Sequence, residues 1–508
     1  MIQFLTLVSF ALGVGLLYAG YIIFHQFTYW KRRKMLHLTP TPLFGNTAPL
    51  FFRTNAFSTH FQKLYNNFPG ARYFGAFDNK TPAILIKDPD LVREICIKNF
   101  DSFSDHDAFI TEDMDPVIFR NLFNLEGEYW RRMRNLLTPS FTASRMKLMF
   151  ELIAECSNDF VQYFLDNPEV ASSFDAKDAF SRYTGDVIGT AAFGIKVNSM
   201  KDRNNEFYRH GISATSFKLI DFIRFQLMII FPKLMRWAGF TFLPNATDRF
   251  LKNIITETVK VRQEKGIVRQ DMIHLLMLAM DKKDNSQKVT IDDIIGQAFF
   301  FFLAGFDASS SAMSFLCHQL AANPDVQNKL REAIIYQVNK DNGKISYNSL
   351  VQIKYLDMVI NETLRMYPSA PFTNRVCVKE YDFSPPMEGY PNLHVEKGTQ
   401  IFLPIYAYHR DPKYFPCPDK FDPERFSESN KSSINPYMYQ PFGIGPRQCI
   451  GNRFALMVVK IGITDILRFT IQFTEKSRHP IDDYDTTSFP MNRKNGFWLK
   501  FEELKKSN

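Results

Sequence analysis

Apolar residues recur along most of this chain with the 3.6-residue period of helices. Helical patterns cover residues 129–137, 147–165, 176–193, 205–231, 245–264 and 269–280, and the longest runs over 294–323. Two short apolar stretches, 72–77 and 83–86, flank turn residues and predict a β-hairpin. Residues 101–128 lack a clear period but are rich in phenylalanine. The pattern therefore predicts a mainly α fold with small β-sheets, of the α+β class.

The first thirty residues form the most continuous apolar stretch. Residues 2–30 contain no Asp, Glu, Lys or Arg, and the segment 4–24 has about the length that spans a bilayer. The basic cluster Lys31-Arg32-Arg33-Lys34 follows, which places the domain behind it in the cytosol by the positive-inside rule. A cleaved signal peptide would carry its basic residues ahead of the apolar core. We expect an uncleaved transmembrane signal anchor over residues 1–30.

The segment after the anchor predicts a hinge. Residues 31–48 contain the basic cluster and then Thr39-Pro40-Thr41-Pro42, which forbids a helix. No later segment has the composition of a linker, so residues 49–508 are predicted to form a single catalytic domain. A second apolar stretch, 222–242, is too interrupted to span a membrane. It either dips into a membrane beside the anchor or is a core helix.

Composition narrows the range of partners. The chain has 508 residues and a net charge of +8, and the excess is not gathered in runs of the kind that bind nucleic acid. Modest basicity of this kind favours an anionic membrane surface or an acidic protein partner over nucleic acid. The six cysteines are isolated, without a CxxC or Cys/His cluster, which argues against zinc and fits a reducing compartment.

Cys449 carries the strongest chemical signal. It lies in the stretch from Phe442 to Gly451, directly before an apolar helical run. Gly443 and Gly445 let the backbone turn tightly and approach a flat partner. The amides at the start of the next helix, together with the neighbouring Arg447, favour a thiolate. Such a loop suits a haem whose iron binds sulfur and whose propionates bind arginine, whereas a lone cysteine is otherwise a buried structural residue.

The spacing Phe-x-x-Gly-x-Arg-x-Cys-x-Gly resembles the haem-binding signature of the cytochrome P-450 monooxygenases at all five fixed positions. Further motifs occur in that family's order and extend the resemblance over nearly the whole chain. The exact residues of these motifs are most similar to those of insect detoxification members of the microsomal type. The motifs are Trp130-x-x-x-Arg134, Ala304-Gly305-Phe306-Asp307, Glu362-x-x-Arg365 and Pro423-Glu424-Arg425-Phe426. The resemblance implies the cytochrome P-450 fold and haem b (iron protoporphyrin IX), with Cys449 as the axial iron ligand.

The resemblance also assigns roles to individual residues. The haem contacts that it implies are Trp130, Arg134, Arg375, Phe442, Arg447 and Cys449, with Trp130 and the arginines binding the propionates. A structural network below the haem would consist of Glu362, Arg365 and Arg425. An oxygen-binding groove would be formed by Ala304, Gly305, Asp307 and Ser309. Substrate would contact Phe109, Phe119, Phe123, Phe306, Ala370 and Phe372. For the 101–128 loop alone, packing on the core is an equally good interpretation.

Ala308 departs from the family's pattern. The family has a threonine there, whose hydroxyl helps to organise proton delivery during dioxygen activation, and a methyl group cannot hydrogen-bond. Ser309 lies about 100° further around the helix and cannot simply replace it. Asp307 with water could still carry protons; alternatively, Asp307 is paired elsewhere at a crossing of closely packed helices.

The function that the resemblance implies is insertion of one oxygen atom from O2 into a lipophilic small molecule, a xenobiotic or an endogenous lipid or hormone. Electrons would come from NADPH through an NADPH–cytochrome reductase, with cytochrome b5 as a second donor, at the endoplasmic reticulum membrane. Arg131 and Arg132 are candidates to meet the reductase's acidic face. Two alternatives remain: a same-fold isomerase or dehydratase of oxygenated lipids that needs no O2 activation, and a non-catalytic haem-binding protein.

Overall fold

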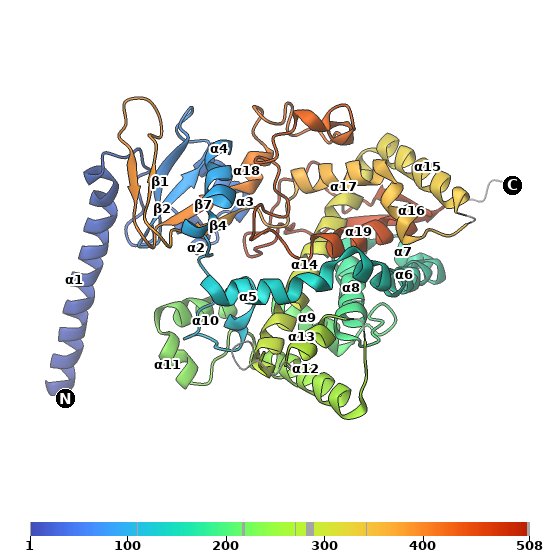
Figure 1. Ribbon diagram of the computed structural model, residues 1–508, viewed down its shortest axis with the longest axis horizontal. Coiled ribbons are helices and arrows are strands. Elements are labelled where there is room, and N and C mark those ends of the chain that lie inside the picture. The colour runs from blue at the N-terminus through green and yellow to red at the C-terminus, as the bar shows by residue number, and fades with distance from the viewer. Residues whose placement is uncertain are drawn as a thin grey trace. The chain divides into compact units, whose positions relative to one another are not determined.

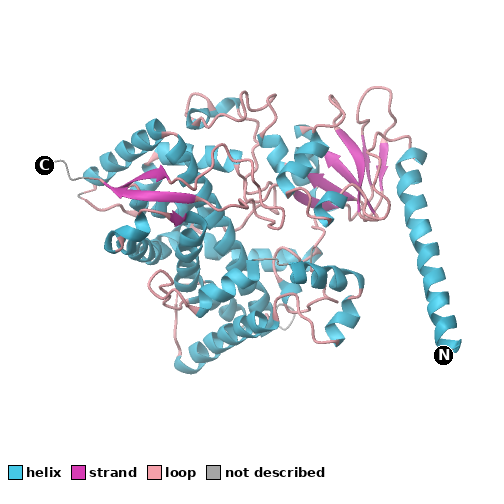
Figure 2. Ribbon diagram, turned by 180° about the vertical axis from the view of Figure 1, so that it is seen from behind, coloured by secondary structure: helices cyan, strands magenta, loops and turns pink. Residues whose placement is uncertain are grey.

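The computed structural model describes residues 2–108, 110–215, 219–269, 271–280, 289–341 and 343–504. These residues form two compact units. The sheet unit comprises Met1–Asp107, Ala370–Tyr414 and Asn435–Gln448, and the helical unit comprises Ala108–Ser369, Phe415–Ile434 and Cys449–Asn508. Figure 2 shows the strands of each unit against its helices.

The sheet unit is built on a four-stranded sheet in the order β1-β2-β7-β4. Strand β2 pairs antiparallel with β1 and parallel with β7, and β4 closes the sheet antiparallel to β7, with Arg375 opposite Ile401. Its elements are α1 (Ile2–Arg32), α2 (Ala48–Phe51), α3 (Phe57–Tyr65), β1 (Tyr73–Asp78), β2 (Thr81–Ile86), α4 (Pro89–Arg93), β4 (Thr373–Val376), β5 (Tyr381–Phe383), β6 (Leu393–Val395), β7 (Gln400–Leu403) and α18 (Ile405–His409). Two short π or 3-10 turns, η1 (Glu94–Lys98) and η2 (Phe100–Ser102), follow α4.

The helical unit is organised around α14 (Ile291–Ala322), which is buried over most of its length. Thr290 caps its first turn: the Thr290 hydroxyl accepts from the Asp293 amide, and the Asp293 carboxylate accepts from the Thr290 amide. Asn323 ends the helix, and Pro324 opens the next one. Helix α8 (Ala176–Ile188) packs closely along α14, because a Cβ on Gly305 would overlap Ile188.

The other elements of the helical unit surround this pair of helices. They are α5 (Gly127–Leu137), α6 (Ala143–Asp166), α7 (Pro168–Ala171), α8 (Ala176–Ile188), α9 (Glu206–Thr215), α10 (Leu219–Ile230), α11 (Pro232–Trp237), α12 (Asn245–Lys265), α13 (Met272–Met280), α15 (Pro324–Lys340), α16 (Tyr347–Gln352), α17 (Lys354–Met366) and α19 (Asn452–Ile466). A second sheet, in the order β3-β9-β8, joins β3 (Phe174–Asp175), β8 (Phe469–Phe473) and β9 (Trp498–Glu503). Short turns occur at η3 (Ile118–Arg120), η4 (Thr138–Phe141), η5 (Gly189–Phe193), η7 (Pro423–Phe426) and η8 (Lys431–Ser433).

The predicted α+β class and the predicted β-hairpin are confirmed. The hairpin is formed by β1 and β2, and most predicted helices occur within a few residues of their expected bounds. The pattern over 205–231 is divided between α9 and α10, on either side of residues 216–218, which lie outside the described part of the chain. Between residues 101 and 126, the part of the chain that the structure describes contains only short turns, as the missing period indicates, and α5 begins at Gly127.

Two helices bear on the prediction of a membrane anchor. Among the described residues, the helix that could cross a bilayer by length and composition is α14, but 67% of its most apolar window is buried inside the protein, so α14 is a core helix. Helix α1 is continuous from Ile2 to Arg32. Its C-terminal end lies beside the four-stranded sheet, and its N-terminal end extends away from the sheet (Figure 1). Large apolar side chains along it, among them Phe10, Leu16 and Leu17, are exposed.

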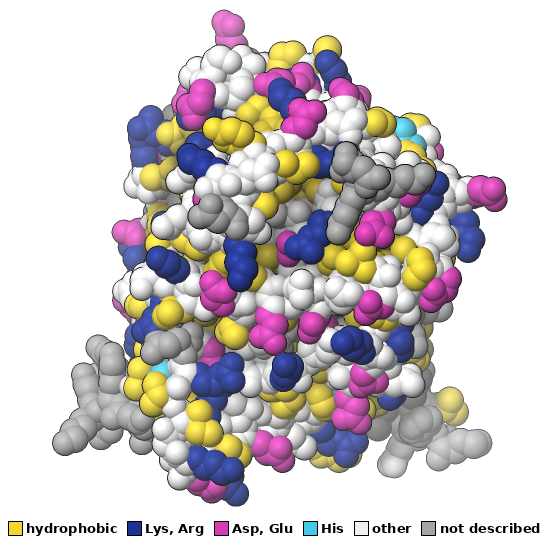
Figure 3. Space-filling view, turned by 90° about the vertical axis from the view of Figure 1, so that its right-hand side faces the viewer, with side chains coloured by type: hydrophobic (Ala, Val, Ile, Leu, Met, Phe, Trp, Pro, Cys, Tyr) yellow, Lys and Arg dark blue, Asp and Glu magenta, His cyan; other side chains and the backbone are white. Residues whose placement is uncertain are grey.

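Charged side chains do not gather by sign on the face drawn in Figure 3. Lys and Arg side chains are interspersed there with Asp and Glu among the described residues. On that face, the net charge of +8 therefore does not produce a basic field of the kind that binds nucleic acid.

Candidate haem site

The loop before α19 turns as its glycines predict. Gly443 and Gly445 adopt φ angles of 73° and 74°, in the left-handed region. A Cβ on Gly445 would overlap the carbonyl oxygen of Cys96, because the loop crosses the backbone of η1 there. Glycine is therefore required at 445 by both backbone conformation and close approach.

Cys449 lies just ahead of α19, whose N-cap residue is Gly451. The thiol has exposed surface, yet protein atoms surround it closely enough that burial raises its pKa. The Gly451 amide and the charge of Arg134 act in the opposite direction and favour the thiolate. The sequence predicted that amides at the start of this helix would favour the thiolate. It also predicted Arg447 as the favouring cation, but in the structure that cation is Arg134 on α5.

Trp130 and Arg134 lie one turn apart on α5, as the four-residue spacing predicts. Trp130 is buried. Burial lowers the pKa of Arg134, and within the described residues no carboxylate pairs with it. The inward side of α5 thus presents a partly desolvated cation that an acidic group would stabilise.

Arg375 on β4 is the buried cation whose surroundings most clearly favour an anionic ligand. Its side chain is fully buried, and burial lowers its pKa. Its Nη1 donates to the Asn374 carbonyl at 2.7 Å, but its Nε has no acceptor, and no carboxylate pairs with it among the described residues. A buried guanidinium of this kind is costly unless a ligand carboxylate completes it. The residues present therefore fit the propionates of a haem.

His106 is a neighbour of Arg375 that the sequence analysis did not identify. Its Nδ1 lies 2.9 Å from the Asn374 carbonyl and 3.3 Å from Arg375 Nη1. Burial and the charges of Arg375 and Arg447 hold the pKa of His106 well below its usual value, so the ring is neutral. Its place in the aperiodic 101–128 segment gave no signal, because the contact depends on β4, some 270 residues away in sequence.

Arg447 is engaged within the sheet unit. Its Nε donates to the Ser104 carbonyl at 2.8 Å, and its Nη2 lies 3.1 Å from Asp105. The guanidinium is almost fully buried. Arg447 is therefore held in one orientation by Asp105, which leaves it fewer donors for a propionate than Arg375 has. Phe442 precedes this residue in the same loop and is half-buried.

One face of α14 remains accessible in the middle of the helix. Ala304 is exposed and Ala308 is half-buried, whereas Phe302, Ser309 and Ser310 are buried. Residues 301, 304 and 308 lie on one side of a helix, so Ala304 and Ala308 line the same stripe. Of the residues predicted to form the oxygen-binding groove, Ala304 lies on this stripe, whereas Asp307 and Ser309 are buried and lie off it. Near this stripe, the Ser369 hydroxyl donates to the Ala308 carbonyl at 3.3 Å.

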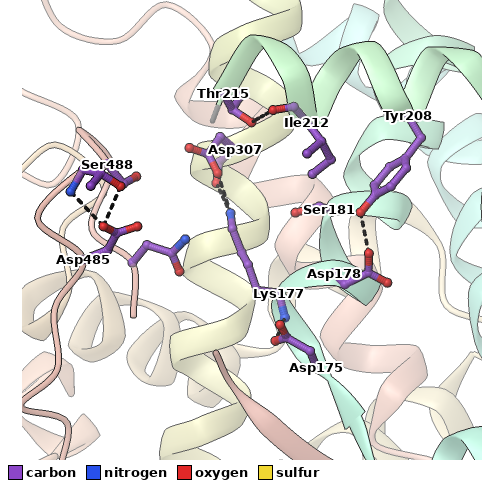
Figure 4. A pocket seen from close by; sticks show the side chains of 12 residues that line it. Asp175, Lys177, Asp178, Ser181, Tyr208, Ile212, Thr215, Asp307, Asp485 and Ser488 are labelled. Atoms are coloured by element: carbon purple, nitrogen blue, oxygen red, sulfur yellow. Dashed lines mark hydrogen bonds and ion pairs between the residues drawn. The ribbon is translucent and has the colours of Figure 1, made fainter. Parts of the chain in front are cut away.

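Asp307 points away from that stripe and is ion-paired. Lys177 Nζ, on α8, lies 2.5 Å from Asp307 Oδ1 and donates to the hydroxyls of Ser310 and Ser311 at 2.6 and 2.8 Å. Both partners line a cavity of about 410 Å³ together with Asp175, Asp178 and Tyr208 (Figure 4). The alternative of an Asp307 paired elsewhere is thus the one observed, and Lys177 is a site residue that the sequence did not reveal.

Glu362, Arg365 and Arg425 are brought together as the motifs predict. Arg365 donates twice to Glu362, at 2.7 and 2.9 Å, and both side chains are fully buried. Arg425 Nε lies 3.4 Å from Glu362, whose Oε1 also accepts from the Asp422 amide at 2.9 Å. Arg365 further donates to the Pro418 carbonyl at 2.8 Å. This network fixes the 415–425 segment to α17.

The predicted substrate contacts are spread over both units. Phe123 stacks on Phe300, and Phe119 is half-buried. Phe306 is fully buried beside Phe302 and Tyr208, off the accessible stripe of α14. Phe372 stacks on Phe61 in the core of the sheet unit, next to the half-buried Ala370. Phe109 lies outside the described residues.

Two features are of the kind that a haem-thiolate protein uses: in the helical unit, Cys449 directly before α19, and in the sheet unit, the buried Arg375 without a carboxylate partner among the described residues. The model of the cytochrome P450 family matches residues 36–499. The chain is 40% identical to cytochrome P450 9e2 of Blattella germanica, over 99% of both chains. It is 37% identical to probable cytochrome P450 9f2 of Drosophila melanogaster, over 97% of this chain and 98% of that one. Cytochrome P450 6a8 of the same fly is 35% identical, over 98% of this chain and all of that one.

The chain therefore belongs to the cytochrome P450 family. It has the cytochrome P450 fold, its cofactor is haem b, and it is a monooxygenase of the oxidoreductase class.

Proposed function

We propose that this monooxygenase oxidises a lipophilic small molecule, a xenobiotic or an endogenous lipid, with electrons that an NADPH-dependent reductase supplies. The observation that supports haem binding in this proposal is the buried Arg375, whose Nε has no acceptor among the described residues. The accessible stripe of α14 carries Phe301, Ala304 and Ala308, which are all apolar and favour an apolar substrate.

Cys449 would hold the iron, and Trp130, Arg134 and Arg375 would hold the propionates. Haem supplies activation of dioxygen when it is bound to a thiolate, and the protein's part is to orient it and to control water and protons. Arg447 would add one further contact while Asp105 fixes its orientation. The buried Glu362, Arg365 and Arg425 network would keep the cysteine side rigid, because a buried ion pair tolerates little displacement.

Asp307 is the proposed source of protons for the reaction. Its carboxylate faces Lys177 and the polar cavity of Figure 4, so water in that cavity can exchange protons with it. Ala308 offers no hydroxyl to relay them along the accessible stripe. The Ser369 hydroxyl lies beside this stripe and donates to the Ala308 carbonyl. We propose that ordered water takes the place of the missing hydroxyl.

We propose that the protein is located at the endoplasmic reticulum membrane, with the catalytic part on the cytosolic face. Two surfaces support it. Apolar side chains are exposed along α1, and a second exposed apolar set lies on α10 and α11, where Ile220 is 69% exposed, Leu234 58% and Trp237 85%. Exposed apolar sets of this size mark surfaces that meet a membrane or a partner, and the α1 set adjoins a basic cluster.

The reductase and, as a second donor, cytochrome b5 are proposed to meet the outward side of α5. Arg131 and Arg132 are half-buried there, on the helix that also carries Arg134. Arg131 lies 3.4 Å from the exposed Glu128, a pair that solvent weakens and an acidic partner can replace.

The test of the haem-thiolate site is the ferrous carbon-monoxide spectrum of the wild type and of Cys449→Ser. The wild type is expected to give the family's red-shifted band and Cys449→Ser to lose it, while Cys417→Ser, at an exposed cysteine without this role, retains it. A red-shifted band in Cys449→Ser would refute the assignment.

Turnover with 18O2, NADPH and reductase tests the reaction on a lipophilic panel. Monooxygenation places one labelled atom in the product. Conversion of a lipid hydroperoxide without O2 or NADPH, and no labelled product, would instead support the isomerase alternative that Ala308 raises. Haem incorporation and reduction without any turnover would support a binding protein.

A further inference from the structure

The last two turns of α1 are attached to the sheet unit by ring packing, hydrogen bonds and an ion pair. The Trp30 indole is 1% exposed and donates to the Ala76 carbonyl at 2.8 Å. It lies flat against Gly75, where a Cβ would be 2.6 Å from the ring. No side chain larger than hydrogen fits at 75 while Trp30 is in place.

Polar contacts hold the same turns from two more directions. The Gln26 amide donates to the Asn79 carbonyl, and its oxygen accepts from the Leu43 amide at 2.9 Å. Tyr29 donates to Glu396 at 2.8 Å, and Arg33 pairs with the other oxygen of the same carboxylate. The Arg33 guanidinium also lies 3.6 Å above the Tyr29 ring.

The ionisation of these groups is consistent with a fixed contact. Burial and the hydrogen bond to Glu396 raise the pKa of Tyr29 to about 12. Burial alone would raise the pKa of Glu396, but the hydrogen bonds from Tyr29 and Arg33 hold it below its usual value. The phenol thus stays a donor, and the carboxylate stays an acceptor, throughout the physiological range.

Side-chain exposure along α1 decreases over residues 19–25. Side chains up to Tyr18 are exposed wherever they are described, those from 19 to 25 are mixed, and Gln26, Tyr29 and Trp30 are buried. Residues 3–24 would measure about 33 Å along a helix, close to the ~30 Å of a bilayer core. Contact with the sheet unit begins at Tyr18, whose hydroxyl accepts from Lys80 Nζ at 3.2 Å, and continues at His25, whose ring meets Phe77. The exposed stretch therefore runs directly into the attached one.

The proline segment after α1 is held as well. The Leu38 amide donates to the Gly75 carbonyl at 2.9 Å, and the Asn46 amide donates to the Phe77 carbonyl at 2.8 Å. Within the sheet unit, residues 37–46 thus follow the sheet edge by backbone hydrogen bonds. A segment held at both ends in this way cannot act as a joint.

We propose that residues 25–33 form a dock, by which α1 and the sheet unit move on the membrane as one rigid body instead of swinging on a hinge. The dock sets the height and the tilt of the sheet unit above the bilayer. This inference rests on the proposed role of α1 as the anchor.

Limited trypsin digestion of the haem-loaded full chain in phosphatidylcholine vesicles tests the dock. Lys31, Arg32, Arg33 and Lys34 are cleavage sites within or beside it, so cleavage there requires the helix end to open. We expect slow cleavage in the wild type and an increase of at least tenfold in Gly75→Ala and in Trp30→Ala. Glu396→Gln changes a half-exposed partner of Tyr29 and Arg33 and should give a smaller increase.

Two controls separate the dock from general loosening. Gly20→Ala makes the glycine change on α1 where a Cβ meets nothing within 4 Å, and Glu388→Gln removes an exposed carboxylate of the same unit. Both should be cleaved at the wild-type rate. Rapid cleavage of the wild type, or equal rates in the wild type and Gly75→Ala, would overturn the proposal.

Rigidity itself is measured by the distance between spin labels on genetically encoded side chains at Leu12 and Lys98, both exposed. A narrow distance distribution in the wild type that broadens in Gly75→Ala supports the dock, and a broad wild-type distribution refutes it. Flotation with vesicles tests the anchor separately. Because the apolar set on α10 and α11 can also meet the membrane, a chain without residues 2–24 should float less than the full chain, and equal flotation of the two refutes α1 as the anchor. A full chain that floats but shows a broad distance distribution refutes only the dock.

Discussion

At the scale of single residues, the site is defined by what its side chains lack. Arg375 is a buried cation whose Nε has no acceptor, and Ala308 is a methyl group where the family's hydroxyl would be. The sequence identified both positions by motif. It could not show that Asp307 pairs with Lys177, because the partner lies 130 residues earlier on another helix. That pairing turns the carboxylate toward the cavity of Figure 4 and away from the accessible stripe of α14.

Ala308→Thr is expected to raise the ratio of product formed to NADPH consumed. Ala308 lies on the accessible stripe, so a hydroxyl there can order water that the methyl group cannot. The ratio is measured as product against NADPH oxidised under reductase turnover. Ala304→Ser is the matched control, one turn away on the same stripe. An unchanged ratio in Ala308→Thr would mean that water already serves the role without a side-chain hydroxyl.

Lys177→Met is expected to lower stability by about 2–3 kcal/mol, because it leaves Asp307 with a poorly compensated charge. The loss is smaller than for a fully buried pair, since both side chains keep some contact with solvent. Urea unfolding of Lys177→Met and of Lys177→Met/Asp307→Asn measures it. The double variant should recover part of the loss. If the double variant is less stable than the single one, the pair is not the source of the effect.

At the scale of elements, the network of α17 and the 415–425 segment illustrates a limit of sequence patterns. Glu362 and Arg365 are three residues apart, a spacing that on most helices describes a solvated pair. In the structure both side chains are fully buried, and the Glu362 carboxylate also interacts with Arg425 and accepts from the Asp422 amide. The family resemblance supplied that distinction, since the helix pattern alone favoured the surface pair.

Arg365→Leu is therefore expected to cost about 3–5 kcal/mol, because it strands a buried carboxylate. Lys329→Ala is the control: Lys329 pairs with Glu424 at a half-exposed site, where an ion pair contributes about 1 kcal/mol or less. Thermal unfolding of both variants in the haem-loaded form compares them. Equal losses would contradict the buried role of Arg365.

At the scale of the whole molecule, buried histidines make stability depend on pH. Burial, with the charges of Arg493 and His479, lowers the pKa of His318 to about 3, and burial lowers the pKa of His60 to about 4. In the unfolded chain both rings have a pKa near 6.5. Below pH 6.5 the unfolded chain binds protons that the folded chain does not. The stabilisation is thus complete above pH 6.5 and is lost as the pH falls toward 4 and 3, by about 1.4 kcal/mol per pH unit for each ring.

The urea concentration at the unfolding midpoint should therefore decrease when the pH is lowered from 7.5 to 5.5. The decrease should be smaller in His318→Gln than in the wild type. His394→Gln is a control of opposite sign. His394 is exposed, and its hydrogen bond to Asp382 raises its pKa, so its removal should not reduce the fall. The same pH dependence in His318→Gln and the wild type would contradict the role of His318.

The sequence by itself determined the class of the protein, because that information is local. The loop from Phe442 to Gly451, the caps of α14 and the β1–β2 hairpin each depend on residues near one another in the chain. Tertiary structure alone decided which charges are compensated. Arg134 is the cation that favours the Cys449 thiolate, Asp105 pairs with Arg447, and Lys177 pairs with Asp307. It also decided that Trp30 closes onto Gly75, since packing and desolvation depend on chain segments that no local pattern brings together.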